Sequence, residues 1–152
     1  MKNLINKFIE DKKIGIVGVS GKQKNWGKTL YKEFKEKGYD VRAVNPEISE
    51  FDGEKCYRTI DELPEETSNI IFAVSENIAF KILEKSSLQN KKIIWLLRGA
   101  SSKRNIQLAK EKNMEVIHTL CPLLFIYEKG FHRFHYNILR FFHLFPKSYS
   151  KN

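Results

Sequence analysis

Cysteine and long apolar runs are both scarce in this sequence. Two cysteines, Cys56 and Cys121, occur in 152 residues and form no CxxC pair, so reduced thiols are expected and a disulfide framework is not. The longest apolar runs, such as Ile93–Leu97, have the length of one strand and are too short to span a membrane. Charges interrupt the first thirteen residues, which leaves no apolar export signal. We therefore expect a cytoplasmic protein with no membrane partner.

Acidic residues are also few. There are 18 of them against 27 lysines and arginines, and the formal net charge is +9. The positive electrostatic potential of a protein with this net charge attracts phosphates, whether they belong to nucleic acid or to an anionic cofactor. A basic, solvated surface with no ligand stays open as the alternative, because lysines are spread along the chain. With 41% hydrophobic and 30% charged residues, the composition is typical of one globular domain.

Short apolar runs alternate with amphipathic windows, which predicts a parallel sheet with crossover helices. The runs lack polar alternation, as expected for strands covered on both faces. Strands are predicted at 13–19, 41–45, 69–74, 92–97 and 114–118, and helices at 1–13, 27–37, 76–85 and 102–112. The stretch between Pro46 and Pro64 is predicted to be a polar loop with a helical turn at 60–63. The expected fold is therefore α/β, Rossmann-like, with a doubly wound parallel five-stranded sheet.

The sequence changes character after Pro122, where phenylalanines alternate with lysines and arginines and no acidic residue follows Glu128. We expect residues 1–122 to form the Rossmann-like domain and residues 123–152 to form a C-terminal helical extension packed on it. A homodimer through this extension stays open. A nucleic-acid binder that uses the basic aromatic tail is a further alternative, but nucleic acid is a less favoured partner because the aromatics recur at the helical spacing typical of packing.

The first strand ends in a glycine-rich turn, with Gly15, Gly18 and Gly21 spaced three apart. Backbone amides in such a turn, followed by the positive end of a helix dipole, form a phosphate site. A hydroxyl and three lysines add donors and charge: Ser20, Lys22, Lys24 and Lys28. The dinucleotide fingerprint GxGxxG is absent, and five residues instead of four separate Gly21 from Gly27, which excludes a regular Walker loop. A plain strand-to-helix turn is the alternative.

The second strand ends without the acidic residue that NAD-binding domains use to bind ribose hydroxyls. Asn45 and Pro46 stand there, and the nearest acid, Glu47, lies beyond the proline. Ordinary NAD recognition is therefore not expected.

Taken together, these segments resemble the CoA-binding domain of the succinyl-CoA synthetase α-subunit and of small stand-alone bacterial CoA-binding proteins. The resemblance covers nearly the whole chain. Its elements are Gly18-Val19-Ser20, Val44-Asn45-Pro46, Gly53-Glu54-Lys55-Cys56-Tyr57, Arg98-Gly99-Ala100, Cys121-Pro122 and Phe131-His132-Arg133. Two features depart from the synthetase pattern: Leu120 replaces an asparagine before the Cys-Pro, and the second domain with its phosphorylated histidine is missing.

The resemblance implies binding of coenzyme A or an acyl-CoA and implies a place for each segment. Gly18, Ser20 and Lys22 would hold the phosphates, and Asn45 and Pro46 would lie near the adenosine. Val19, Lys24 and Gly27 belong to the same loop segment and are further candidate binding residues. The groove would be lined by Ala73, Val74, Ser75, Leu97, Arg98 and Gly99, and Cys121 and Pro122 would close it near the pantetheine.

Catalysis is the less favoured interpretation. Cys121 lies three residues after His118, so a thiol-exchange or CoA-thioester enzyme using Cys121 stays open, but neither residue has a visible third partner. His132 and His135 lack a third metal ligand nearby. We expect a CoA-binding protein without its own catalytic machinery and without a metal.

Overall fold

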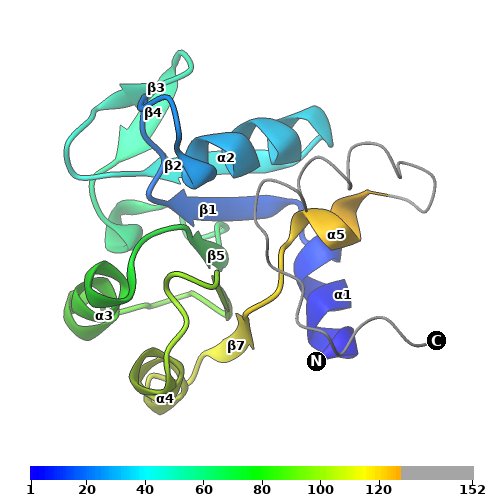
Figure 1. Ribbon diagram of the computed structural model, residues 1–152, viewed down its shortest axis with the longest axis vertical. Helices are drawn as coiled ribbons and strands as arrows, with labels where there is room; N and C mark the ends of the chain where they lie inside the picture. The colour runs from blue at the N-terminus through cyan, green and yellow to red at the C-terminus, as the bar shows by residue number, and fades with distance from the viewer. Residues whose placement is uncertain (128–152) are drawn as a thin grey trace.

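The computed structural model describes residues 1–127, in which helices lie on both faces of one seven-stranded sheet (Figure 1). The helices are α1 (Lys2–Glu10), α2 (Trp26–Glu36), α3 (Glu76–Lys85), α4 (Lys103–Glu111), α5 (Leu123–Ile126) and the 3-10 turn η1 (Ile60–Glu62). The strands are β1 (Lys13–Val17), β2 (Asp40–Val44), β3 (Glu50–Phe51), β4 (Glu54–Tyr57), β5 (Asn69–Phe72), β6 (Ile93–Leu96) and β7 (Glu115–His118).

The strands follow the order β3-β4-β2-β1-β5-β6-β7. Every pairing between neighbours is parallel except that of β3 with β4. From β1 the chain first builds outward through β2 and β4, then returns to the other side of β1 and continues through β5, β6 and β7. This is the doubly wound Rossmann order, and its switch point lies between β1 and β5. The predicted α/β Rossmann-like fold is confirmed, and each of the five predicted strands is present.

The prediction of five strands was too low, because the segment assigned to a polar loop contains a hairpin. Phe51 of β3 pairs with Glu54 of β4, so the connecting turn is the dipeptide Asp52-Gly53. Both turn residues have positive φ, 54° and 75°, as a type I′ turn requires. The Asp-Gly pair is the local signal that predicts such a hairpin. β4 then runs parallel to β2, with Val44 opposite Tyr57.

The sheet separates two apolar cores. α1, α2 and α5 cover one face, while α3, α4 and η1 cover the other, as the positions of α2 and of α3 and α4 show in Figure 1. The first core contains Ile5, Phe8, Leu30, Phe34, Ile16, Trp95, Ile117 and Leu123, and the second contains Ile60, Leu83, Ile70, Phe72, Ile94, Leu96 and Ala109. Neighbouring residues within a strand, such as Ile94 and Trp95, point to opposite cores. The continuous apolar runs of the sequence follow from this burial on both faces.

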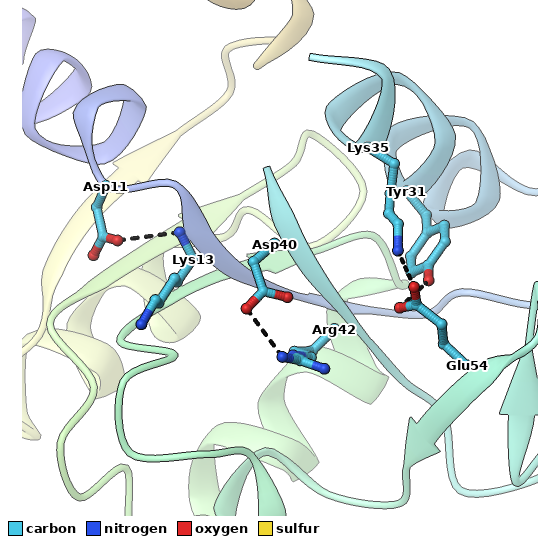
Figure 2. A network of polar contacts seen from close by, with 7 residues as sticks. All are labelled: Asp11, Lys13, Tyr31, Lys35, Asp40, Arg42 and Glu54. Carbon is cyan, nitrogen blue, oxygen red and sulfur yellow. Dashed lines mark hydrogen bonds and ion pairs between the residues drawn. The ribbon is translucent and has the colours of Figure 1, made fainter. Parts of the chain in front are cut away.

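Helix α1 is fixed to the sheet by packing and by polar contacts at its end. The Phe8 ring lies edge-on to the Trp95 ring, with 5.0 Å between centroids. The Asp11 carboxylate accepts hydrogen bonds from the Lys13 amide, shown in Figure 2, and from the side chains of Ser68 and Asn69, each at 3.1 Å. These contacts join α1 to the amino-terminal edge of the sheet, opposite the edge at which β1 ends.

The β3–β4 hairpin is fastened to α2. In Figure 2, Lys35 and Tyr31 of α2 converge on Glu54 of β4, and the Tyr31 hydroxyl donates to its carboxylate at 3.1 Å. The hydrogen bond from Lys35 lowers the pKa of Glu54 below its usual value, whereas burial and the neighbouring Glu54 raise the pKa of Tyr31. The contacts hold the short strand β4 beside β2 and so fix where β4 ends.

The predicted C-terminal extension is described only at its beginning. Leu123 of α5 is buried in the core that α1 and α2 share, and the Tyr127 hydroxyl donates to the Glu33 carboxylate of α2. Residues 128–152 lie outside the described residues, and so do the predictions of packing, dimerisation and nucleic-acid binding made from them. Among residues 1–127, no helix is long and apolar enough to cross a membrane.

Candidate functional site

The candidate site is the edge of the sheet at which the six parallel strands end. Loops follow the strands there in the spatial order β4, β2, β1, β5, β6, β7. Each segment that the sequence analysis selected lies in one of these loops or at its end: 45–46 after β2, 18–27 after β1 and into the first turn of α2, 73–75 after β5, 97–99 after β6 and 121–122 after β7. With strands about 4.8 Å apart, the row from β4 to β7 is about 24 Å long. Such an edge suits an elongated ligand.

Gly18 brings the end of β1 against the loop that follows β5. Its φ is +95°, a conformation that favours glycine, and its amide donates to the Val44 carbonyl at 3.0 Å. A Cβ at this position would lie 2.5 Å from the carbonyl oxygen of Ala73. The backbones on the two sides of the switch point therefore touch, and the Gly18 amide is occupied by β2.

Gly27 brings the first turn of α2 against the same place. A Cβ on Gly27 would lie 2.5 Å from the Gly18 carbonyl oxygen and 2.9 Å from the Val19 nitrogen. The helix therefore begins directly on the Gly18–Val19 peptide, and the partial positive charge of its amino terminus lies beside the loop. A glycine is needed at position 27 because the helix backbone lies against the Gly18–Val19 peptide, and this need does not depend on a Walker motif.

Asn25 is a central residue of this loop that the sequence analysis missed. As the N-cap of α2, it accepts hydrogen bonds at Oδ1 from the amides of Lys28 (2.7 Å) and Ser20 (3.1 Å). Its Nδ2 donates to the Gly18 carbonyl at 3.0 Å. An asparagine immediately before a predicted helix is a recognised N-cap signal that could have identified it. One side chain therefore closes the turn from Gly18 to Lys28.

The contacts of Asn25 determine which backbone amides of the loop remain free to donate a hydrogen bond to a ligand. The Ser20 amide is occupied by Asn25, and the Ser20 hydroxyl lies 3.4 Å from the Lys22 amide, which donates to it. Within the described part of the chain, the amides of Gly21, Gln23 and Lys24 donate no hydrogen bond. Free donors therefore lie in the outer part of the loop rather than at Gly18 and Ser20.

Asn45 connects the end of β2 to the same loop. Its Nδ2 donates to the Val19 carbonyl at 2.8 Å, and its backbone amide donates to the Tyr57 carbonyl of β4 at 2.9 Å. Its Oδ1 accepts from the Glu47 amide at 2.8 Å. The side chain is thus used to position the loop, and Pro46 is the exposed residue at this strand end.

On the other side of the switch point, a further asparagine side chain joins two loops by hydrogen bonds. Asn105 is fully buried, and its Nδ2 donates to the carbonyls of Glu76 at 3.0 Å and Ala100 at 2.8 Å. These two carbonyls belong to the first turn of α3 and to the loop after β6. Asn105 therefore fixes the loops after β5 and β6 to each other. Ser75, Arg98 and Gly99 remain exposed along them.

The loop after β7 holds the cysteine of the candidate site. The indole Nε1 of Trp95 donates to the Leu120 carbonyl at 2.9 Å, and Pro122 is buried. Burial raises the pKa of the Cys121 thiol, which disfavours the thiolate at neutral pH. Among the described residues no hydrogen bond joins Cys121 to His118, and the buried Nδ1 of His118 has no partner. A Cys-His pair is therefore not assembled in this arrangement.

We predict that Gly27→Ala destabilises the fold by about 1–3 kcal/mol, although glycine-to-alanine changes in helices normally stabilise them. The added methyl group meets backbone atoms of Gly18 and Val19, which cannot rotate away. Gly21→Ala is the matched control, because its Cβ would have no atom within 4 Å, and we expect a change within about 0.5 kcal/mol. Urea unfolding measures both, and equal stabilities for the two variants would contradict the close approach.

We also predict that Cys121 reacts slowly with iodoacetamide at pH 7.5 and faster as the pH rises beyond 9. Alkylation follows the thiolate, and a raised pKa leaves less thiolate at neutral pH than a free cysteine has. The Cys121 rate is the difference between the native protein and Cys121→Ser, which retains Cys56. A rate at pH 7.5 above that of free cysteine would contradict this prediction and favour the thiol-exchange alternative.

Comparison with known proteins gives a family for this arrangement. A family model described as "CoA binding domain" matches residues 12–126. The uncharacterised protein YneT of Bacillus subtilis (strain 168) is 29% identical over 112 residues, which cover 72% of this chain and 82% of YneT.

Solved structures share the fold. A conserved hypothetical protein from Pyrococcus furiosus has a TM-score of 0.69 and 28% identity, and the match covers 74% of this chain and 97% of that one. A dinucleotide-forming acetyl-coenzyme A synthetase 1 from Ca. Korarchaeum cryptofilum has a TM-score of 0.64 and 18% identity, and the match covers 78% of this chain but 28% of the synthetase chain. The family match covers all five segments of the candidate site and leaves out helix α1. The chain belongs to the family of CoA-binding domains.

Proposed function

We propose that this protein binds coenzyme A or an acyl-CoA along the carboxyl edge of its sheet, with the diphosphate at the loop between β1 and α2. The observation that carries the proposal is the close approach at the switch point, where Gly18, Gly27 and Ala73 bring three backbone segments together. Ligands of open α/β sheets bind at such a point. Membership of the CoA-binding domain family names the class of ligand.

Several groups near the loop favour an anion there. The amides of Gly21, Gln23 and Lys24 are free within the described residues, and α2 directs its amino terminus toward the loop. Lys22 and Lys24 are exposed, and neither forms an ion pair with another described residue. Diphosphate oxygens would accept charge-assisted hydrogen bonds from these donors.

The order of the strands suits the order of the parts of coenzyme A. With the diphosphate at the central loop after β1, the adenosine would lie toward Asn45 and Pro46. The pantetheine would then run over the loops after β5 and β6 toward Cys121 and Pro122. The hydrogen bonds of Asn105 hold those two loops in a fixed position relative to each other, and such preorganisation reduces the entropy lost on binding.

We further propose that binding occurs without catalysis by this chain. A nucleophilic cysteine requires a thiolate and a base within reach. Burial raises the pKa of the Cys121 thiol, which disfavours the thiolate at neutral pH. The buried Nδ1 of His118 forms no hydrogen bond with any described residue. These features favour a binding role.

We predict that calorimetry shows CoA binding at least ten times more tightly than NAD. The end of β2 offers Asn45, whose side chain is bound to Val19, where NAD recognition needs a carboxylate. A tenfold difference corresponds to about 1.4 kcal/mol. Equal affinities for the two ligands would contradict the proposal.

The same titration has a matched control for the phosphate loop. Replacing Lys22 and Lys24 together by alanine should weaken CoA binding, and replacing Lys13 and Lys92 should not. All four lysines are exposed, so the net charge changes equally, but Lys13 and Lys92 lie at the amino-terminal edge of the sheet. Equal losses from both pairs would indicate a general charge effect instead of a phosphate site.

A further inference from the structure

The β3–β4 hairpin brings a residue to the candidate site that the sequence analysis did not select. β4 pairs with β2 in parallel, so its carboxyl end lies at the same edge as those of β2 and β1. The Asn45 amide donates to the Tyr57 carbonyl at 2.9 Å, which fixes the two strand ends side by side. Arg58 follows Tyr57 immediately, so it lies beside Asn45 and Pro46.

Arg58 is held by its backbone, while its side chain is exposed. Its amide donates to Oε2 of Glu62 at 3.2 Å, within the turn that leads from β4 into η1. The side chain is exposed, and none of the ion pairs among residues 1–127 includes it. The neighbouring cation Lys55 lies over the Tyr57 ring, 4.8 Å from its centroid. Arg58 therefore presents at this end of the edge an exposed guanidinium that forms no ion pair with another described residue.

We propose that Arg58 recognises the 3′-phosphate on the ribose of CoA and so distinguishes CoA from dephospho-CoA. The inference rests on the proposed function, which places the adenosine at Asn45 and Pro46. In Rossmann domains the ribose lies at the end of the second strand, and a nearby arginine can receive a ribose-bound phosphate. The planar guanidinium binds a phosphate with two parallel hydrogen bonds. Here that arginine comes from the neighbouring strand β4.

The test compares CoA with dephospho-CoA in the full-length protein by calorimetry. The native protein should prefer CoA at least tenfold, and in Arg58→Gln this preference should fall to about one while the dephospho-CoA affinity is unchanged. Arg58→Lys should keep part of the preference, because it retains charge without the planar fork. Since the Arg58 side chain is exposed, unchanged melting temperatures are expected.

Arg104→Gln is the matched control, because Arg104 is an exposed arginine on α4, outside the segments proposed to hold the ligand. It should leave the ratio of the two affinities at its native value. If the native protein binds CoA and Arg58→Gln keeps the native ratio, the assignment of Arg58 is overturned and the proposed function stands. If the native protein binds neither ligand, or binds NADP more tightly than CoA, the proposed function itself is contradicted.

Discussion

The candidate site depends on one steric constraint, the close approach of three backbone segments at the end of β1. Gly18, the first turn of α2 and the loop after β5 lie so near one another that a single methyl group at Gly18 or Gly27 would meet backbone atoms at 2.5 Å. This contact sets the height of α2 above the sheet and therefore the position of its amino terminus. Because Gly18 and Gly27 carry no side chain, the backbone itself forms the surface of the sheet edge at the switch point.

Three asparagine side chains fix the loops around this contact by hydrogen bonds. Asn25 closes the loop after β1, Asn45 connects the loop to the end of β2, and Asn105 joins the loops after β5 and β6. Each amide offers both donors and an acceptor, so one side chain can satisfy groups from two segments. Because these hydrogen bonds occupy the inner amides, the outer loop residues and the lysines provide the remaining donors. The arrangement is a row of loops joined by side-chain hydrogen bonds, with the exposed Lys22 and Lys24 near its centre.

Much of the fold could be predicted from the sequence, because burial on both faces produces continuous apolar runs that are easy to recognise. All five predicted strands and the four helices before Pro122 are present. The segments predicted to form the site follow strands that end at the same edge of the sheet. The hairpin at residues 50–57 was missed because its strands are short and polar, although Asp52-Gly53 is a turn signal. Missing β4 also meant missing Arg58, whose place depends on the direction of that strand.

The roles of individual polar residues were harder to predict, since they depend on contacts between segments distant in sequence. The selection of Ser20 and Asn45 as ligand-binding residues stays a prediction, and the sequence did not indicate that Asn25 occupies the Ser20 amide or that the Asn45 side chain donates to Val19. No pattern in the sequence indicates that Asn105 bridges Glu76 and Ala100. A resemblance to a family can locate such residues at a site, but only the geometry separates those that could bind a ligand from those that position the loops.

The most direct measurement is a crystal structure of the protein with CoA. It should show diphosphate oxygens within hydrogen-bond distance of amides between Gly21 and Lys24, the adenosine beside Pro46 and the pantetheine over the loops after β5 and β6. CoA bound at the amino-terminal edge of the sheet, near Asp11 and Lys13, or bound with its diphosphate away from the loop between β1 and α2, would contradict the account.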